Sequence, residues 1–343
     1  MSKKVAVVPG DGAGKEVVPE AVKVLRAVGA GLEFEEYDIS ADRYLATGVS
    51  LDEDTFADLR GADAILFGAV GDPRVDEHYA AGILLRIRFE MDLWANLRPA
   101  RLYDARLSPL RDEKAREVDL LVVRENTEGV YIGAGGRFKK DTPDEVAIQE
   151  DVNTYKGVNR ILEDAFRRAR REVCMVDKSN AMGFAGGLWQ SRWKAVAPAH
   201  PEVRARHLYS DACAMELVRD PSQFDVIVTG NLFGDLLSDL SAQLIGGMGI
   251  APSANLNPDT GQGLFEPVHG SAPKLAGRGI VNPVGAILSA GMMLSQLGLE
   301  DEAKAVEDAV VATIRDRRCT ADIGGELSTS AAGDAVVRNL KGV

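Results

Sequence analysis

Short apolar runs that end in polar residues or glycine recur along the chain. The first is KVAVVPGDG at residues 4–12, where four hydrophobic residues precede a Pro/Gly turn. Runs of this kind are typical of strands that are buried on both faces. Four further runs share the design: ADAILFGAVG (62–71), VDLLVVREN (118–126), EVCMVDKSN (172–180) and FDVIVTGN (224–231). We predict that each of these runs forms a buried strand.

The segments between the runs have the spacing of helices. Apolar residues recur every three to four positions over residues 16–28, and residues 157–171 and 186–200 are also predicted helices. Strands that alternate with helices favour an α/β fold with a parallel-rich sheet. In such sheets ligands bind beyond the carboxyl ends of the strands, so the polar strand ends GDG, REN, DKSN and TGN are expected to form one active-site rim. Because no repeat or linker divides the chain, we expect two interwoven domains.

Composition and charge narrow the possible partners. The chain has 343 residues, of which 45% are hydrophobic and 27% charged, and a formal net charge of -12. That charge argues against nucleic acid or an anionic membrane as a partner. Cys174, Cys213 and Cys319 follow no metal-ligand spacing, and their odd number argues against a disulfide framework. With no signal-type segment and no run as long as a membrane span, we expect a cytoplasmic protein.

Two glycine-rich stretches are candidate ligand loops. In GDGAGKE (10–16), Gly10 lies only four residues before Gly14, so the spacing of a phosphate loop is absent. The dinucleotide pattern G-x-G-x-x-G also fails because Lys15 takes the last glycine place, and a tight strand-to-helix turn is the local interpretation. EPVHGSAPKLAGRG (266–279) is long for a loop in a compact domain. Ligand binding through its backbone amides and a plain loop are equally open.

Arginines cluster in and after the apolar segment LLRIRFEMDLWANLRPAR (84–101). The members are Arg86, Arg88, Arg98 and Arg101. Arg124 follows at the end of a predicted buried strand. Guanidinium groups that emerge from apolar surroundings suit bidentate recognition of a carboxylate. The alternative for each arginine alone is a surface ion pair, such as Arg88 with Asp92 at i,i+4, and Arg86 is assigned to the surface.

Two aspartates interrupt an otherwise apolar helical segment, GNLFGDLLSDL (230–240). Asp235 and Asp239 lie four residues apart and so share one helical face, where like charges repel. Solvated surface is the ordinary explanation, but apolar neighbours and a preceding buried strand favour a compensating cation. Asp211 is a third carboxylate near a helix start, and such oxygen ligands suit a hard divalent cation. No HExxH, Cys/His cluster or G-x-S-x-G is present, which disfavours zinc and serine-hydrolase chemistry.

Taken together, these segments resemble the β-decarboxylating dehydrogenases, which include the 3-isopropylmalate, isocitrate, homoisocitrate and tartrate/D-malate dehydrogenases. The resemblance covers essentially the whole chain through PGDGAGKEV, ANLRPAR, VVRENTEGVY, DKSN, VTGNLFGDLLSDL, FEPVHGSAP, NPVGAILSAGMML and DIGGELST. It implies an isocitrate/isopropylmalate dehydrogenase-like fold of two interwoven α/β domains. Residues 1–97 and 247–343 would together form the cofactor-binding domain, and residues 98–246 the central substrate and dimerisation domain.

The resemblance also implies a metal-dependent oxidative decarboxylation in a homodimer. Asp235 and Asp239 match ligands of a Mg2+ or Mn2+ ion, and Asp211 of the second subunit matches a third ligand that also contacts substrate. Lys178, from that same second subunit, matches the base that helps to remove the hydroxyl proton. Tyr131 matches the acid that protonates the enolate carbon. The residues that match binders of the carboxylate lost as CO2 are Arg88, Arg98 and Arg124.

In this family the adenosine end of NAD or NADP binds in the EPVHGSAP loop and not on a G-x-G-x-x-G turn. The matching positions are Glu266, His269, Gly270, Ser271, Ala272 and Asn282. NAD-using members usually have an acid directly after HGSAP, but this chain has Lys274. That lysine is similar to NADP-using isocitrate dehydrogenases, which follow it with an aromatic hydroxyl where this chain has Leu275. NAD is therefore favoured, and Lys274 leaves NADP open.

The residues before Arg88 match the positions at which family members distinguish the 3-substituent of the substrate. Isocitrate enzymes have a Ser and an Asn where this chain has Gly82 and Leu84, and homoisocitrate enzymes have an Arg at the place of Leu85. Leu84 and Leu85 would form an apolar wall, against which a third carboxylate would be unpaired. 3-Isopropylmalate is therefore favoured, since burying its alkyl group contributes roughly 1.5–3 kcal/mol.

Other motifs keep alternatives open. RENTEG, DKSN, GIAPSANLNP and GGELST look like tartrate/D-malate dehydrogenases, and Ala181 is smaller than the branched residue typical of 3-isopropylmalate enzymes at that place. A paralogue acting on another 3-alkylmalate is the second alternative. A non-catalytic regulatory subunit is disfavoured, because the three aspartates, the lysine and the tyrosine of the expected site are all present.

Overall fold

The computed structural model describes residues 2–112 and 117–342. Within them, one ten-stranded sheet has the order β2-β1-β3-β12-β11-β4-β5-β10-β8-β9, and β6 and β7 form a separate ribbon. The strands are β1 (Lys3–Gly10), β2 (Leu32–Glu36), β3 (Ala64–Ala69), β4 (Ala95–Arg101), β5 (Asp119–Glu125), β6 (Gly135–Phe138), β7 (Val146–Gln149), β8 (Glu172–Asp177), β9 (Arg204–Tyr209), β10 (Val226–Thr229), β11 (Pro252–Leu256) and β12 (Gly263–Pro267).

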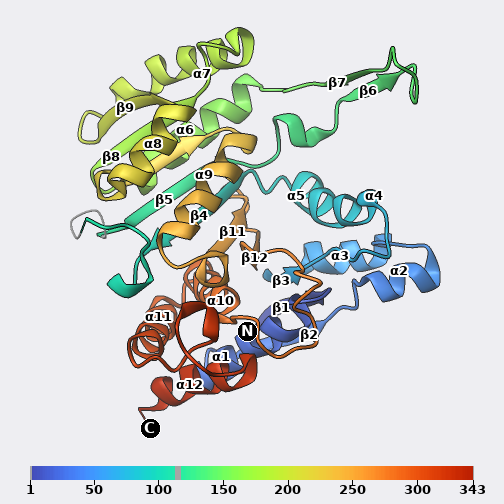
Figure 1. Ribbon diagram of the computed structural model, residues 1–343, viewed down its shortest axis with the longest axis vertical. Helices are drawn as coiled ribbons and strands as arrows, with labels where there is room; N and C mark the ends of the chain where they lie inside the picture. The colour runs from blue at the N-terminus through green and yellow to red at the C-terminus, as the bar shows by residue number, and fades with distance from the viewer. Residues whose placement is uncertain (1, 113–116, 343) are drawn as a thin grey trace.

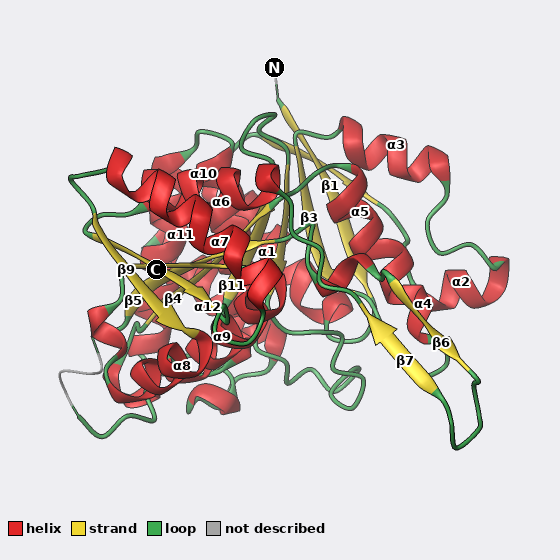
Figure 2. Cartoon of the chain, turned by 90° about the horizontal axis from the view of Figure 1, so that it is seen from above, coloured by secondary structure: helices red, strands yellow, loops and turns green. Residues whose placement is uncertain are grey.

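Helices cover the sheet in groups that Figures 1 and 2 show. They are α1 (Gly14–Val28), α2 (Ala41–Thr47), α3 (Glu53–Gly61), α4 (Glu77–Ala80), α5 (Arg86–Glu90), α6 (Tyr155–Arg168), α7 (Gly183–Val196), α8 (Ser210–Arg219), α9 (Asn231–Leu244), α10 (Val284–Gln296), α11 (Glu300–Arg315) and α12 (Thr329–Lys341). Helices α1, α10, α11 and α12 pack together at one end of the molecule, and α9 lies against β4 and β5 (Figure 1). None of the described helices is long and apolar enough to cross a membrane.

The predicted α/β class is confirmed, and so are the five strands predicted from apolar runs. These runs became β1, β3, β5, β8 and β10, and the predicted helices became α1, α6 and α7. Along β1 the side chains alternate between two hydrophobic cores on opposite faces of the sheet. Val5 and Val7 belong to the larger core, whereas Ala6 and Val8 belong to the smaller core. Burial on both faces explains why this run is continuously apolar.

The direction of the strands reverses three times across the middle of the sheet. Among the described strands, the antiparallel pairings are β12–β11, β11–β4 and β4–β5. Because of these three successive reversals, β5, β10 and β8 run opposite to β1 and β3. The carboxyl ends of the two groups of strands therefore point in opposite directions. The expectation of one rim formed by all the polar strand ends is therefore wrong. The two groups of strands meet instead through β11 and β4.

Strands from the two ends of the chain share one half of the sheet. β1 to β3 lie beside β12 and β11, whereas β5, β10, β8 and β9 come from the middle of the chain (Figure 1). β4 (Ala95–Arg101) contains the boundary expected between residues 97 and 98 and pairs with both β11 and β5. The assignment of residues 1–97 with 247–343, and of residues 98–246, to separate domains stays a prediction.

A matched pair of leucine substitutions tests the core. Leu66 on β3 is 0% exposed, whereas Leu45 on α2 is 51% exposed. We expect Leu66→Ala to lower the free energy of unfolding by about 2–5 kcal/mol, because the buried cavity cannot fully collapse. Leu45→Ala is expected to change it by less than about 0.5 kcal/mol. Chemical denaturation measures both variants, and equal losses would contradict the burial of β3.

Candidate active site

A cleft of about 220 Å3 lies where α5, β4, β5 and α9 approach the loop after β12. The end of β3 and the following Val70 form another part of its wall. The predicted site residues among its lining are Leu84, Arg88, Arg98, Arg124, Tyr131, Asp235, Glu266, His269 and Gly270. Residues that lie far apart in the sequence are therefore brought together at one place in the fold.

Three guanidinium groups enter this cleft from three elements. Arg88 lies on α5, Arg98 on β4 and Arg124 on β5, and none is more than 8% exposed. Burial lowers the pKa of Arg124 below its ordinary value, and the nearby charge of Arg98 lowers this pKa further. Buried charges are stable only beside compensating groups. The cleft therefore concentrates positive charge that suits carboxylates.

Asp235, in the second turn of α9, compensates the positive charges of two of these arginines. Its Oδ1 accepts hydrogen bonds from Arg124 Nη1 at 2.5 Å and from Arg98 Nη1 at 3.1 Å. Burial by itself would raise the pKa of Asp235, but the charges of Arg124 and Arg98 outweigh it and hold the pKa below its ordinary value. Asp235 is therefore a carboxylate anion.

Asp239 lies one turn further along the same face of α9. Its Oδ1 accepts a hydrogen bond from Arg98 Nη1 at 3.3 Å, and its side chain is 45% exposed. Burial raises the pKa of Asp239; Arg98 opposes this rise and the charge of Asp235 adds to it. The like-charge repulsion expected at i,i+4 is thus present, and a divalent cation between the carboxylates would relieve it.

Tyr131 reaches the same carboxylate from a short 3-10 turn, Val130–Ile132. Its hydroxyl donates to Asp235 Oδ2 at 2.8 Å, and its ring centroid lies 5.2 Å from the guanidinium carbon of Arg124. Burial and the negative charge of Asp235 raise the pKa of Tyr131. The phenol therefore keeps its proton at neutral pH.

Two polar residues that the sequence analysis did not single out orient the arginines. Asn231, the first residue of α9, accepts through Oδ1 from Arg124 Nε at 3.0 Å and Nη2 at 2.7 Å. Ser238 Oγ accepts from Arg98 Nη1 at 2.8 Å. A signal for them exists in the sequence: Asn231 ends the TGN segment, and Ser238 shares a helical face with Asp235.

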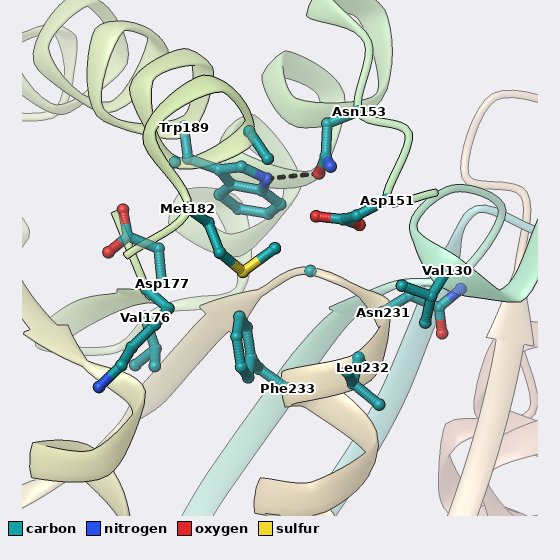
Figure 3. A pocket seen from close by; sticks show the side chains of 14 residues that line it. Val130, Asp151, Asn153, Val176, Asp177, Met182, Trp189, Asn231, Leu232 and Phe233 are labelled. Atoms are coloured by element: carbon teal, nitrogen blue, oxygen red, sulfur yellow. Dashed lines mark hydrogen bonds between the residues drawn. The ribbon is translucent and has the colours of Figure 1, made fainter. Parts of the chain in front are cut away.

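Lys178 and Asp211 do not line this cleft. Lys178 Nζ donates to Asp211 Oδ1 at 2.6 Å, and Lys178 borders a second pocket. Figure 3 shows that pocket between Trp189 of α7 and Phe233 of α9, with the Trp189 indole bonded to Asn153 at 2.8 Å. The predicted base and the predicted third metal ligand are therefore paired with each other, away from the arginines of the same chain.

The expected metal ligands are thus only partly assembled in one chain. Asp235 and Asp239 lie together, whereas Asp211 at the start of α8 is bound to Lys178. Within residues 2–112 and 117–342, no three His, Cys, Asp or Glu side chains are grouped as a metal site. Asp211 is therefore not grouped with Asp235 and Asp239 in the described part of the chain.

The predicted cofactor loop closes one side of the cleft through Glu266, His269 and Gly270. The carbonyl of Gly270 accepts a hydrogen bond from His269 Nδ1 at 2.9 Å. The other ring nitrogen, His269 Nε2, is buried and has no hydrogen-bond partner in the described part of the chain. Burial lowers the pKa of His269, so the imidazole is neutral. Ser271 ties the loop to the start of the chain, since the Ala13 amide donates to its carbonyl at 2.7 Å.

Four predicted cofactor residues do not line the cleft: Ser271, Ala272, Lys274 and Asn282. Ala272 has a φ of 41°, a left-handed conformation that non-glycine residues rarely adopt. Asn282 is buried, donates to Asp322 Oδ2 at 3.0 Å and accepts from the Val284 amide at the start of α10. Lys274 is exposed. Cofactor roles for these residues stay predictions.

The two leucines of the expected apolar wall differ in position. Leu84 lines the cleft and Leu85 does not, although both belong to the π-helical turn Ala81–Leu85. Arg86 is only partly at the surface, as its side chain is 20% exposed and its guanidinium lies over the ring of Phe56 at 4.7 Å. The expected apolar wall is therefore represented in this cleft by Leu84.

The surface-pair alternative for Arg88 is wrong. Arg88 Nη2 donates to Glu266 Oε1 at 2.8 Å inside the protein. Asp92 pairs instead with Arg160, at 2.8 Å. Arg88 is thus a buried arginine with a buried acidic partner.

Comparisons with known proteins cover almost the whole chain. Residues 4–336 match the isocitrate/isopropylmalate dehydrogenase family. A 3-isopropylmalate dehydrogenase of Frankia casuarinae is 47% identical, with 96% of this chain and 100% of the relative covered. The 3-isopropylmalate dehydrogenase of Mycobacterium tuberculosis is 46% identical, with 95% of this chain and 99% of the relative covered. That of Streptomyces coelicolor is also 46% identical, with 97% of this chain and 99% of the relative covered.

Solved structures give the same result for the fold. The crystal structure of isocitrate dehydrogenase from Methylococcus capsulatus matches with a TM-score of 0.92 and 34% identity, covering 99% of this chain and all of that one (100%). A Thermus thermophilus protein matches with a TM-score of 0.88 and 37% identity over 99% of this chain and 68% of its own. The predicted fold is confirmed. The chain belongs to the isocitrate/isopropylmalate dehydrogenase family.

Proposed function

We propose that this chain oxidatively decarboxylates 3-isopropylmalate to 4-methyl-2-oxopentanoate and CO2 with NAD(P), a reaction of leucine biosynthesis. The observation that carries the proposal is one cleft in which three buried arginines, Asp235 and the apolar side chain of Leu84 converge. Such a cleft suits an alkyl-substituted dicarboxylate. The relatives named 3-isopropylmalate dehydrogenase, similar over nearly their whole length, support the same substrate.

The arginines would bind the carboxylate that leaves as CO2. Arg88 and Arg98 each keep a buried Nε without a hydrogen-bond partner in the described part of the chain. An unpaired buried donor is costly, and a substrate carboxylate would supply the missing acceptor. Arg124, held by Asn231 and Asp235, adds charge at a fixed place. The binding groups are therefore positioned before substrate arrives.

Asp235 and Asp239 fit a Mg2+ or Mn2+ ion. Both are acidic oxygen donors on one face of α9, and their mutual repulsion favours a cation. Asp211 of a second subunit would provide the third carboxylate. A bound ion would supply Lewis acidity at the substrate hydroxyl and C1 carboxylate.

Tyr131 and Lys178 would move the protons. Because burial and Asp235 raise the pKa of Tyr131, the phenol keeps a proton that it can donate to the carbon that loses CO2. Lys178 of the second subunit would accept the hydroxyl proton as a neutral amine, and Asp211 Oδ1 lies 2.6 Å from its Nζ and orients it. These assignments give each group of the shared site a separate task.

The cofactor would bind along the loop after β12. His269 offers a buried Nε2 that has no partner among the described residues and is a hydrogen-bond acceptor at the cleft. Bound NAD would supply the hydride acceptor for C2 of the substrate. The adenosine ribose of NAD would be distinguished from the 2′-phosphorylated ribose of NADP near Lys274, which is exposed and can therefore contact a 2′-phosphate. NAD is favoured, and NADP is the alternative.

A homodimer would complete the site, and apolar surface supports it. Met215 and Val218 on α8 and Leu236 on α9 are 73%, 52% and 59% exposed. The ribbon of β6 and β7 stands away from the rest of the chain (Figure 1), and its Phe138 is 57% exposed. A two-stranded ribbon is marginally stable alone, so a second copy that covers it would stabilise it.

The proposed setting is the cytoplasm, without a nucleic-acid or membrane partner. All three cysteines are free thiols and buried. Free thiols are typical of a reducing compartment. The net charge of -12 disfavours polyanionic partners.

A substrate panel assayed with each cofactor tests the proposed function. The panel contains 3-isopropylmalate, 3-ethylmalate, D-malate, tartrate and isocitrate, each assayed with Mn2+ and after chelation. We expect the highest kcat/KM for 3-isopropylmalate, because Leu84 offers an apolar contact, and we expect activity to be lost on chelation. A higher kcat/KM for D-malate or tartrate would favour the tartrate/D-malate alternative. No NAD(P)H formation with any substrate would contradict the proposal.

The cofactor preference has a single-residue test. Lys274→Asp removes a positive charge and adds an acceptor for ribose hydroxyls, so the ratio of kcat/KM for NAD to that for NADP should rise about tenfold or more. Arg278→Asp, an equal charge change at an exposed position of the same loop, is the control. An equal rise in both variants would assign the effect to the general charge of the loop and not to Lys274.

A further inference from the structure

A hydrogen-bonded series of buried amide and carboxylate groups crosses the middle of the sheet. Its members are Asn126 after β5, Asn96 on β4, Asn255 on β11 and Glu266 on β12. Asn96 and Asn255 are 0% exposed, and Glu266 is 6% exposed. Buried polar groups need hydrogen-bond partners, so a change in one member affects the next.

The neighbouring backbone fixes the direction of the Asn255 amide. Asn96 Nδ2 and Asn126 Nδ2 each donate to a backbone carbonyl oxygen, at 3.2 and 2.9 Å. Carbonyl oxygens only accept hydrogen bonds, so the side-chain atoms of Asn96 and Asn126 that face them must be the amide nitrogens. Both also donate to Asn255 Oδ1, at 3.1 and 2.9 Å. Asn255 Nδ2 therefore points the other way, toward Glu266.

The carboxylate of Glu266 connects Asn255 to Arg88. Glu266 Oε1 accepts from Asn255 Nδ2 at 2.8 Å and from Arg88 Nη2 at 2.8 Å. In the part of the chain that the structure describes, the Glu266 carboxylate has these two hydrogen bonds, and the Arg88 guanidinium has only the one with Glu266. The direction of the guanidinium thus depends on Glu266, and that of Glu266 depends on Asn255.

We propose that Asn255 is a positioning residue that holds the substrate-binding guanidinium of Arg88 in place through Glu266. This inference rests on the proposed function, in which Arg88 binds the carboxylate of the substrate. Asn255 does not line the cleft, so it acts through its neighbour. Without the Nδ2 donor, the buried Glu266 carboxylate keeps only Arg88 as a partner in the described part of the chain. It would turn toward other donors and release the Arg88 guanidinium.

Two substitutions at Asn255 and one control separate this role from general packing. Asn255→Asp keeps an acceptor for Asn96 and Asn126 but replaces the donor with a carboxylate that faces Glu266. Asn255→Leu removes donor and acceptor at similar volume and without charge. Ser253→Ala, on the same strand and also 0% exposed, removes an acceptor of Asn96 at 2.9 Å. Ser253 lies opposite Glu266 in the β11–β12 pairing, but its hydroxyl makes no hydrogen bond with the Glu266 carboxylate in the described part of the chain.

Steady-state kinetics gives the first readout. In both Asn255 variants kcat/KM for 3-isopropylmalate should fall about tenfold to a hundredfold, mostly through a higher KM for 3-isopropylmalate and less through the KM for NAD. Ser253→Ala should stay near the wild type. An equal fall in Ser253→Ala, or wild-type KM values in both Asn255 variants, would overturn the proposal.

A double-variant cycle gives the second readout. If Asn255 acts through Glu266, Asn255→Leu should cause little further loss in a Glu266→Gln background. A full additional loss would show that Asn255 acts by another route and would overturn the proposal.

Crystal structures of the same variants give a readout that does not need turnover. The Arg88 guanidinium should leave its contact with Glu266 in Asn255→Asp and Asn255→Leu and keep it in Ser253→Ala. An unchanged Arg88–Glu266 contact in both Asn255 variants would overturn the proposal. If the wild type acts on no 3-alkylmalate, the proposed function fails, while the position of Arg88 still decides the role of Asn255.

Discussion

The pairing of Asp235 with Arg98 and Arg124 is the interaction on which the site depends. Two buried guanidinium groups on neighbouring strands would be unstable without an anion, and α9 supplies one by lying across β4 and β5. Asn231 and Ser238 on the same helix accept further hydrogen bonds from Arg124 and Arg98. The same contacts keep Asp235 ionised, the form that the proposed metal ion requires. Stability and proposed chemistry therefore place the same demand on α9.

The reversal of strand direction brings the binding groups together from distant parts of the chain. β11 and β4 run antiparallel to their neighbours, so the half of the sheet built from the chain ends meets the half built from the middle. Arg88 and Glu266 come from the first half and Arg124 from the second. The buried amide of Asn255 lies at this junction and links Glu266 to Asn96 and Asn126. The sheet thus connects parts of the site by hydrogen bonds and not by packing alone.

Much of this arrangement follows from local sequence patterns, and the rest depends on pairing between distant segments. Continuous apolar runs predicted five strands, and the i,i+4 spacing of Asp235 and Asp239 predicted that both lie on one helical face, where both accept from Arg98. The metal ion expected between them stays a prediction. The single rim was wrong because β11 and β4 reverse the sheet, and no pattern within one run encodes its neighbour. Asn255 was missed for the same reason, since an amide gains its role from the groups that face it. Family membership came from motifs spread over the whole chain and is borne out by the full-length relatives.

The central claim is that each active site combines the arginine cleft of one chain with Lys178 and Asp211 of another. Mixed dimers of Asp235→Asn and Lys178→Ala chains test it most directly. Each variant alone should be inactive. If sites are shared, a mixed dimer has one doubly damaged site and one intact site, so an equal mixture should regain about a quarter of wild-type activity. A mixture as inactive as its parents would show that Lys178 serves the cleft of its own chain and would contradict the account.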